Sequence, residues 1–217
     1  MPWTWEENTT RYRDADTGRF LSGSDIRDLS SESIRVAGGG TDQLARMLTD
    51  DQINVRDWET LMRQSIKREY VKQYLEGRGG VSQMTPQDWG SIGGMLADQY
   101  RYLDDFAVEI ADTELTEAQI AMRSQMYIHS SREALSRATA RAKDWPELPS
   151  HIADGSTICL TNDRCFWSGE RVGAFWEMTW NLNFDAEHCT SEEVDGQDRP
   201  RGCIERAVLW NPLVIEA

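Results

Sequence analysis

The chain has 217 residues, of which 39% are hydrophobic and 28% are charged, and its formal net charge is −14. This length allows one or two domains, and the negative charge would repel nucleic-acid phosphates, so we expect no direct nucleic-acid binding. No run of about 18 apolar residues occurs, which argues against a transmembrane helix or a membrane partner. The first residues lack the basic and apolar regions of a secretory signal, so we expect folding in a reducing cytoplasm.

Residues 1–40 have the composition of an extended arm. The stretch 11–22 is charged and contains a turn signal at Gly18, and three consecutive glycines, 38–40, predict a flexible hinge. Aromatic residues in such an arm favour docking onto another chain, because they cover a large area with few rotatable bonds. The candidate partner-binding residues are Trp3, Trp5, Tyr12 and Phe20. The alternative for the two tryptophans is that they fold back onto the protein's own domain.

Residues 41–145 predict a helical domain. Apolar residues recur there at steps of three or four, which is typical of helices that bury one face. Helix starts are indicated by a capping-box pattern at Thr49, by Thr85 followed by a proline, and by a second capping-box pattern at Thr116. Three helices are therefore expected, over residues 50–75, from residue 85 onwards, and from residue 116 to near residue 145. Their short connections predict an antiparallel helical bundle.

Residues 146–217 predict a small α+β module with little core of its own. Glycine and proline recur along this segment, and residues 174–182 alternate apolar and polar side chains, which is typical of a strand. We expect residues 165–167 to pair with this strand across a turn at 168–170. Residues 201–210 predict a short closing helix. The expected fold is therefore mainly α, with an extended arm, a bundle and a Cys-rich module.

All four cysteines lie in this C-terminal segment, and one histidine adjoins them. The candidate metal ligands are Cys159, Cys165, Cys189, Cys203 and His188. A structural zinc ion is one interpretation, because thiolates and imidazole are its preferred ligands and zinc stabilises loop-rich modules. Two disulfides are a second interpretation, and buried free thiols are a third. The spacings do not decide between them, because neither cysteine pair has the short Cys-x-x-Cys arrangement of a zinc knuckle.

No catalytic motif is recognisable in the sequence. A phosphate-binding loop, a nucleophile elbow and a His-Glu-x-x-His zinc motif are all missing. His129 falls in the middle of an expected helix, and the adjacent carboxylates Asp104 and Asp105 point apart on a solvated face. We therefore expect a protein that is not an enzyme.

Several segments of the chain resemble minor head proteins of tailed bacteriophages, of the head-morphogenesis type. The similar segments are 12–20 in the arm, 99–107 and 115–127 in the helices, and 154–165, 187–189, 201–207 and 210–213 in the Cys-rich tail. Two departures stand out: the family usually has a cysteine where Asp163 stands, and residues 190–202 form an acidic insertion before the last cysteine.

The resemblance implies a structural component of a phage virion, present in several copies and assembled in the cytoplasm of a bacterial host. Its partners would then be other virion proteins, such as the major capsid protein, the portal or the neck, in the head or the head–tail region. The Cys-rich tail would act as a structural staple. The alternative function that we consider is a cytoplasmic protein-binding module stabilised by zinc.

Overall fold

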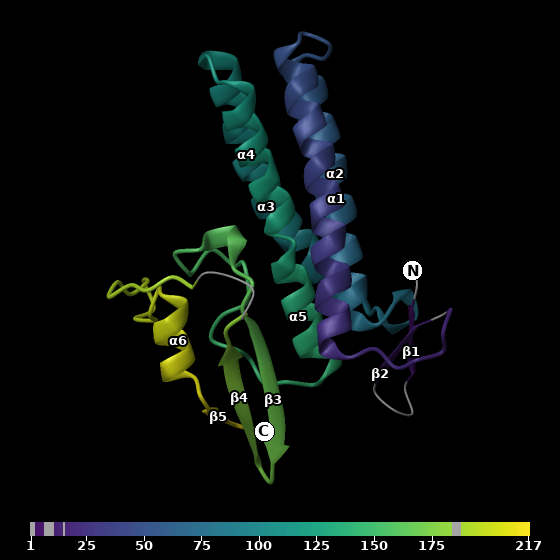
Figure 1. Cartoon of the computed structure of the whole chain (residues 1–217), viewed down its shortest axis with the longest axis vertical. Helices are drawn as coiled ribbons and strands as arrows, with labels where there is room; N and C mark the ends of the chain where they lie inside the picture. Colours follow the sequence, from purple (N-terminus) through teal and green to yellow (C-terminus); the bar gives the residue numbers. More distant parts are fainter. Residues whose placement is uncertain (1–2, 7–10, 15, 184–187) are drawn as a thin grey trace.

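The computed structural model describes residues 3–6, 11–14, 16–183 and 188–217, and five packed helices form its largest part (Figure 1). The helices are α1 (Gly23–Thr49), α2 (Val55–Arg78), α3 (Pro86–Asp112), α4 (Glu117–His129) and α5 (Arg132–Ala142). Helix α1 packs against α2 and α4, and α2 packs against α3 and α5. Short turns reverse the chain between successive long helices, so the predicted antiparallel bundle is confirmed.

The bundle has a continuous apolar core. Its large, fully buried side chains are Ile34, Trp58, Met62, Ile66, Tyr70, Tyr74, Leu103, Phe106 and Ile128. The rings of Trp58 and Phe106 meet edge to face, with centroids 5.6 Å apart. None of the helices in the described part of the chain is both long enough and apolar enough to cross a lipid bilayer.

Two of the three predicted helix starts are confirmed. Thr85 and Asp88 form a capping box at the start of α3, with Pro86 in the first turn, and Thr116 forms the second box with Gln119 at the start of α4. The third prediction is wrong. Thr49 ends α1, and the side chain of Asn54 caps α2 instead. Asparagine is among the best capping residues, and its position directly before the apolar repeat was the available signal.

The predicted extended arm is correct only for its first part. Strand β1 (Trp3–Glu6) pairs antiparallel with β2 (Arg11–Asp14), whereas residues 23–40 belong to α1. Ser22 and Asp25 cap this helix in a reciprocal box. The three glycines at 38–40, predicted to be a hinge, lie inside it. Helix formation there is driven by packing of α1 against α2 and α4, which outweighs the intrinsic cost of glycine in a helix.

The last predicted helix is interrupted between α4 and α5. Ser130 Oγ donates to the carbonyl of Met126 at 2.7 Å, and Ser131 Oγ donates to the carbonyl of Ile128 at 2.6 Å. Such side chains compete with backbone amides for helical carbonyls. Helix α5 consequently starts afresh at Arg132 and packs against α2, while α4 packs against α1.

The C-terminal module is a three-stranded antiparallel sheet with one short helix. Its elements are a 3-10 turn η3 (Leu160–Asn162), β3 (Phe166–Val172), β4 (Phe175–Asn181), α6 (Cys203–Leu209) and β5 (Leu213–Glu216), with strand order β3-β4-β5. The closing helix and the hairpin are confirmed. The predicted turn at 168–170 is wrong: Val172 pairs with Phe175, and the reversal occurs at Gly173, whose φ of +64° suits glycine.

The module has a core of its own, contrary to the expectation from its composition. Trp167, Trp180 and Trp210 form a triangle with ring centroids 5.2–5.7 Å apart. Arg206 is fully buried beside two of these rings, and its guanidinium donates to the carbonyls of Pro200 and Ser156. Those hydrogen bonds satisfy a cation that would otherwise be costly to bury. The sheet, α6 and the loops before them are thereby joined into one unit.

Candidate metal centre

Four separate segments bring the cysteines into the C-terminal module. Cys159 directly precedes η3, Cys165 directly precedes β3, Cys189 lies in the loop between β4 and α6, and Cys203 is the first residue of α6. Cys165 and Cys203 are buried, and the other two are partly buried. Cys203 therefore belongs to a helix, Cys165 lies next to the sheet, and loops carry the other two cysteines.

Three of the sulfur atoms converge. Cys159 Sγ lies 3.0 Å from Cys189 Sγ and 3.6 Å from Cys203 Sγ, and all three atoms are within 4.8 Å of one another. A tetrahedral zinc ion with Zn–S bonds of about 2.3 Å holds its sulfurs about 3.8 Å apart. The cluster is therefore compact enough for one ion to reach all three sulfurs, which makes it a candidate metal site.

A second group of ligand atoms shares Cys203 with the first. A carboxylate oxygen of Asp163 and the sulfurs of Cys165 and Cys203 also lie within 4.8 Å of one another, and all three residues are buried. The carboxylate is positioned by its neighbours: the backbone amide of Cys165 donates to Oδ1 at 3.0 Å, and Thr157 Oγ1 donates to Oδ2 at 3.2 Å. Cys203 thus connects a three-thiol cluster to a buried carboxylate.

The backbone around Cys203 is tightly constrained. Its amide donates to Cys189 Sγ at 3.3 Å, and the amide of Ile204 donates to the carbonyl of Cys189 at 3.3 Å. A Cβ atom at Gly202 would lie 2.6 Å from the amide nitrogen of Ser191 and would also collide with the carboxylate of Glu205. Glycine is therefore required at 202 for the loop of Cys189 to approach the start of α6 this closely.

The thiols shift one another's protonation. Burial, together with the contact to Cys189, raises the pKa of Cys159 to about 11. The hydrogen bond with Cys165 and then burial raise the pKa of Cys203. Burial opposes ionisation of Cys189, but hydrogen bonds from Cys159 and from the amide of Cys203 outweigh it and lower the Cys189 pKa. Several thiolates at this distance need a cation between them, which is the situation that a divalent metal provides.

His188 is not a member of either group of close ligand atoms among the residues that the structure describes. Its predicted role as a ligand therefore has no geometric support, although it adjoins Cys189. Asp163 is a buried oxygen donor beside the thiols that the sequence pattern of cysteines and histidine did not indicate. The available signal was its position between Cys159 and Cys165, where the minor head proteins that the chain resembles usually have a cysteine.

The predicted partner-binding aromatics lie in the N-terminal region. Trp3 and Trp5 fall in β1 and Tyr12 falls in β2, where Trp5 and Tyr12 are paired, but their side chains lie outside what the structure describes. Phe20 is half-buried, and the guanidinium of Arg13 lies 4.3 Å from the centre of its ring. Phe20 thus contacts the hairpin of its own chain, and docking onto another chain by all four residues stays a prediction.

The described residues thus place several sulfur atoms, which are soft metal ligands, next to the carboxylate of Asp163, which is a hard one. They lie in the module that has the tryptophan core. No protein-family model, no curated protein and no solved structure matches this chain.

Proposed function

We propose that this chain is a non-enzymatic structural protein whose C-terminal module is closed by one zinc ion. The observation that carries this proposal is the convergence of Cys159, Cys189 and Cys203, from segments up to 44 residues apart, onto one point. Soft sulfur donors favour zinc over magnesium and calcium, and closed thiolate sites are typical of structural rather than catalytic zinc.

We propose Cys165 as the fourth ligand, because its sulfur is within 4.8 Å of that of Cys203, although it is not within that distance of all three sulfurs of the cluster. A set of four thiolates leaves no open position for a water molecule or a substrate, which is why the proposed role is structural. Asp163 then orients the segment by holding the amide of Cys165. Outer groups of this kind commonly fix the geometry of metal ligands.

The metal is tested by elemental analysis and thiol counting on the purified full chain. We expect about one zinc per chain under the four-thiolate arrangement, with the thiols protected from a thiol reagent until a chelator is added. Cys189→Ser and Cys203→Ser should lose zinc, whereas His188→Ala, the matched control next to Cys189, should retain it. If the chain contains no zinc and two or four of its thiols fail to react, the proposal is wrong and the cysteines form disulfides. If it contains no zinc and all four thiols react freely, the proposal is wrong and the cysteines are unligated.

We further propose that the chain is a structural component of a tailed-phage virion, a minor head or capsid-associated protein that acts through protein–protein contacts in the head or head–tail region. The support is the resemblance of the helical and Cys-rich segments to minor head proteins. A long helical bundle joined to a stapled module is suited to such a role, because both parts offer rigid surfaces to neighbouring proteins.

The virion assignment is tested by quantitative mass spectrometry of density-purified particles from a host that expresses the chain and its neighbouring genes. We expect its peptides to co-purify with the portal and major capsid proteins in a fixed ratio corresponding to several copies. Recovery only from the particle-free host extract would contradict the virion role and would support the alternative, a cytoplasmic zinc-stabilised module that binds other proteins.

A further inference from the structure

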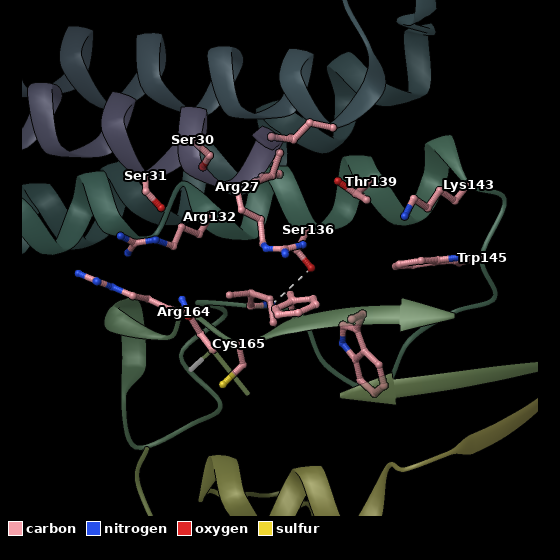
Figure 2. Close-up of a pocket in the computed structure, with 16 residues that line it drawn as sticks. Arg27, Ser30, Ser31, Arg132, Ser136, Thr139, Lys143, Trp145, Arg164 and Cys165 are labelled. Atoms are coloured by element: carbon pink, nitrogen blue, oxygen red, sulfur yellow. Dashed lines mark hydrogen bonds between the residues drawn. The ribbon is translucent and has the colours of Figure 1, made fainter. Parts of the chain in front are cut away.

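A cavity of about 140 Å³ lies between the helical bundle and the C-terminal module. Helix α1, helix α5 and the start of β3 border it, and it is partly open to solvent (Figure 2). Its apolar lining comprises Ile26, Leu135, Trp145, Ile152, Phe166 and Trp167. An engineered apolar cavity of about 150 Å³ holds one benzene molecule, so this cavity has room for a group about the size of one aromatic ring.

Four cationic side chains also line this cavity: Arg27, Arg132, Lys143 and Arg164. The guanidinium of Arg27 reaches from α1 into the space between α5 and β3 (Figure 2). Lys143 lies at one end of that space, and the Arg132 and Arg164 side chains lie at the other. None of the described residues that line the cavity is acidic. This concentration of positive charge is unexpected in a chain whose formal net charge is −14.

The described contacts of these cations are with rings and a carbonyl rather than with carboxylates. The Arg27 guanidinium lies 3.9 Å from the centre of the Phe166 ring, and Lys143 Nζ lies 4.7 Å from that of Trp145. Arg132 Nη1 donates to the carbonyl of Thr161 at 3.1 Å. Within the described part of the chain, no ion pair includes any of the four cations.

Burying a cation that forms no ion pair with a carboxylate among the described residues costs free energy, and this cost is largest for the most buried of the four side chains. Arg132 is only 9% exposed. Burial and then the nearby charge of Arg164 lower the pKa of Arg132 to about 10, against the opposing charge of Asp163, and burial lowers the pKa of Arg27 against the opposing charge of Asp28. A buried cation without a carboxylate partner destabilises a fold, and a bound anion would relieve that cost. The charge and the enclosure therefore favour the same kind of ligand.

We propose that this cavity binds a small organic oxyanion, a carboxylate or phosphate carried on an apolar body about the size of one aromatic ring. Arg132 and Arg164, which lie at the same end of the space, would bind the oxyanion with Arg27 next to them, and the apolar walls would contact the ring. The hydroxyls of Ser31, Ser136 and Thr139 also line the cavity and add hydrogen-bonding groups. This inference goes beyond the proposed function: none of the four cations is a proposed zinc ligand, and Cys165 is the one proposed zinc ligand among the described residues that line the cavity.

The class of ligand is tested by isothermal titration of the full chain with three probes: phenyl phosphate, inorganic phosphate and phenol. We expect phenyl phosphate to bind at least about tenfold more tightly than either of the others, because only it uses both the cations and the apolar walls. Equal affinity for phenyl phosphate and inorganic phosphate would reduce the site to a nonspecific cationic patch. Equal affinity for phenol, or no binding at all, would also overturn the proposal.

The location is tested with single substitutions at exposed positions, which should not disturb folding. Arg164→Gln should weaken phenyl phosphate binding about fivefold to tenfold, since it removes one charge-assisted contact, whereas Lys143→Gln, at the opposite end of the cavity, should weaken it less. Arg171→Gln is the matched control, because Arg171 is an exposed cation on β3 that does not line the cavity. Circular dichroism should be the same for all three variants. A loss of affinity in Arg171→Gln equal to that in Arg164→Gln, or no loss in Arg164→Gln, would place the anion elsewhere.

Discussion

Glu76 is a buried acid near the end of α2, and one of its carboxylate oxygens has no hydrogen-bond partner among the described residues. Burial raises its pKa from 4.5 to about 7, with Lys72 opposing and Glu69 reinforcing the shift. The folded protein therefore holds this proton more tightly than the unfolded chain does. The contribution of Glu76 to the free energy of unfolding should therefore be largest at low pH, and it should fall as the pH rises from about 4.5 through about 7.

Replacing Glu76 by glutamine tests that reasoning. Above about pH 7 the Glu76→Gln variant should be more stable than the natural chain by up to about 3 kcal/mol, and near pH 5 the two should differ little. The measurement is urea unfolding followed by circular dichroism at several pH values. Glu114→Gln changes an exposed glutamate instead and should leave the stability near that of the natural chain. A destabilised Glu76→Gln at pH 8 would show that the charged form makes contacts of its own.

For single residues, the sequence indicated which side chains can bind a metal, but it did not indicate which of them lie close together in the fold. The four cysteines could be selected because no cysteine precedes Cys159 and a small module needs a staple. Which sulfurs approach one another could not be predicted, because it depends on the loop of Cys189 meeting the start of α6. His188 was chosen for its neighbour in sequence, whereas Asp163 is placed by two hydrogen bonds that only the folded chain forms.

At the level of elements, the start of α3 depends on one buried carboxylate. Asp88 is fully buried, and Tyr74 donates to it at 2.9 Å while the Arg141 and Arg78 guanidinium groups pair with it at 3.0 and 3.2 Å. Burial opposes its ionisation, but hydrogen bonds from Thr85, Arg141 and Tyr74 outweigh that and lower its pKa to about 2. This single group therefore joins three helices.

Asp88→Asn should destabilise the protein by about 3–5 kcal/mol at pH 7, because it leaves two arginines without their charge partner. The natural chain should lose the contribution of Asp88 as the pH falls from about 4 towards 2, since its folded pKa lies below its unfolded value. Urea unfolding at pH 7 and pH 3 measures both effects. Asp98→Asn is the control on the same helix. Its ion pair with Arg101 is exposed, so the change should cost less than about 1 kcal/mol.

The contact between α2 and α5 depends on a glycine. A Cβ atom at Gly77 would lie 2.5 Å from the Cβ of Ala138 and 2.7 Å from the carbonyl oxygen of Leu135. Gly77→Ala should therefore destabilise the fold by about 1–3 kcal/mol although alanine is the better helix former. Gly93→Ala in α3 meets nothing within 4 Å and should stabilise by about 0.5–1 kcal/mol. In thermal unfolding, Gly77→Ala should have a lower midpoint temperature than the natural chain, and Gly93→Ala should have a higher one.

Helix boundaries were predictable where a local capping signal marked them and unpredictable where distant packing decided. Thr85 and Thr116 start helices through side chains within three residues, so a sequence window contains all the information. The start of α1 is different. Residues 23–40 read as an arm because of their serines and glycines, yet Ser30 and Ser33 donate to Gln73 and Glu69 of α2, about forty residues away. A short sequence window around α1 does not contain these hydrogen-bond partners, so it could not indicate the helix.

At the scale of the whole molecule, the two apolar cores predict a selective response to metal removal. The bundle core around Trp58 contains none of the cysteines, whereas Cys165 and Cys203 belong to the core of Trp167, Trp180 and Trp210. If zinc closes the module, a chelator should abolish most of the near-ultraviolet circular dichroism of that triangle and leave the far-ultraviolet helical signal largely intact.

The control for the chelator experiment is the same chelator already saturated with zinc, which should have no effect. Re-addition of zinc should restore the tryptophan signal. Simultaneous loss of the helical and tryptophan signals would show that the bundle and the module unfold as one cooperative unit, contrary to the separate cores described above.

The glycines at 38–40 give α1 an uneven local stability. Gly39 and Gly40 are exposed, and apart from the neighbouring residues in the chain and the backbone of the same helix, none of the described atoms lies within 4 Å of the position of a Cβ at either residue. Buried residues on both sides, Ile34 and Ala45, hold the two halves of the helix against its neighbours. Amide hydrogen exchange in α1 should therefore be fastest at its centre rather than only at its ends, and Gly39→Ala with Gly40→Ala should slow exchange there. A helix whose hydrogen bonds open first in the middle can bend there while both of its halves stay packed against their neighbours. The two halves of α1 would then move as separate rigid helices joined at residues 38–40.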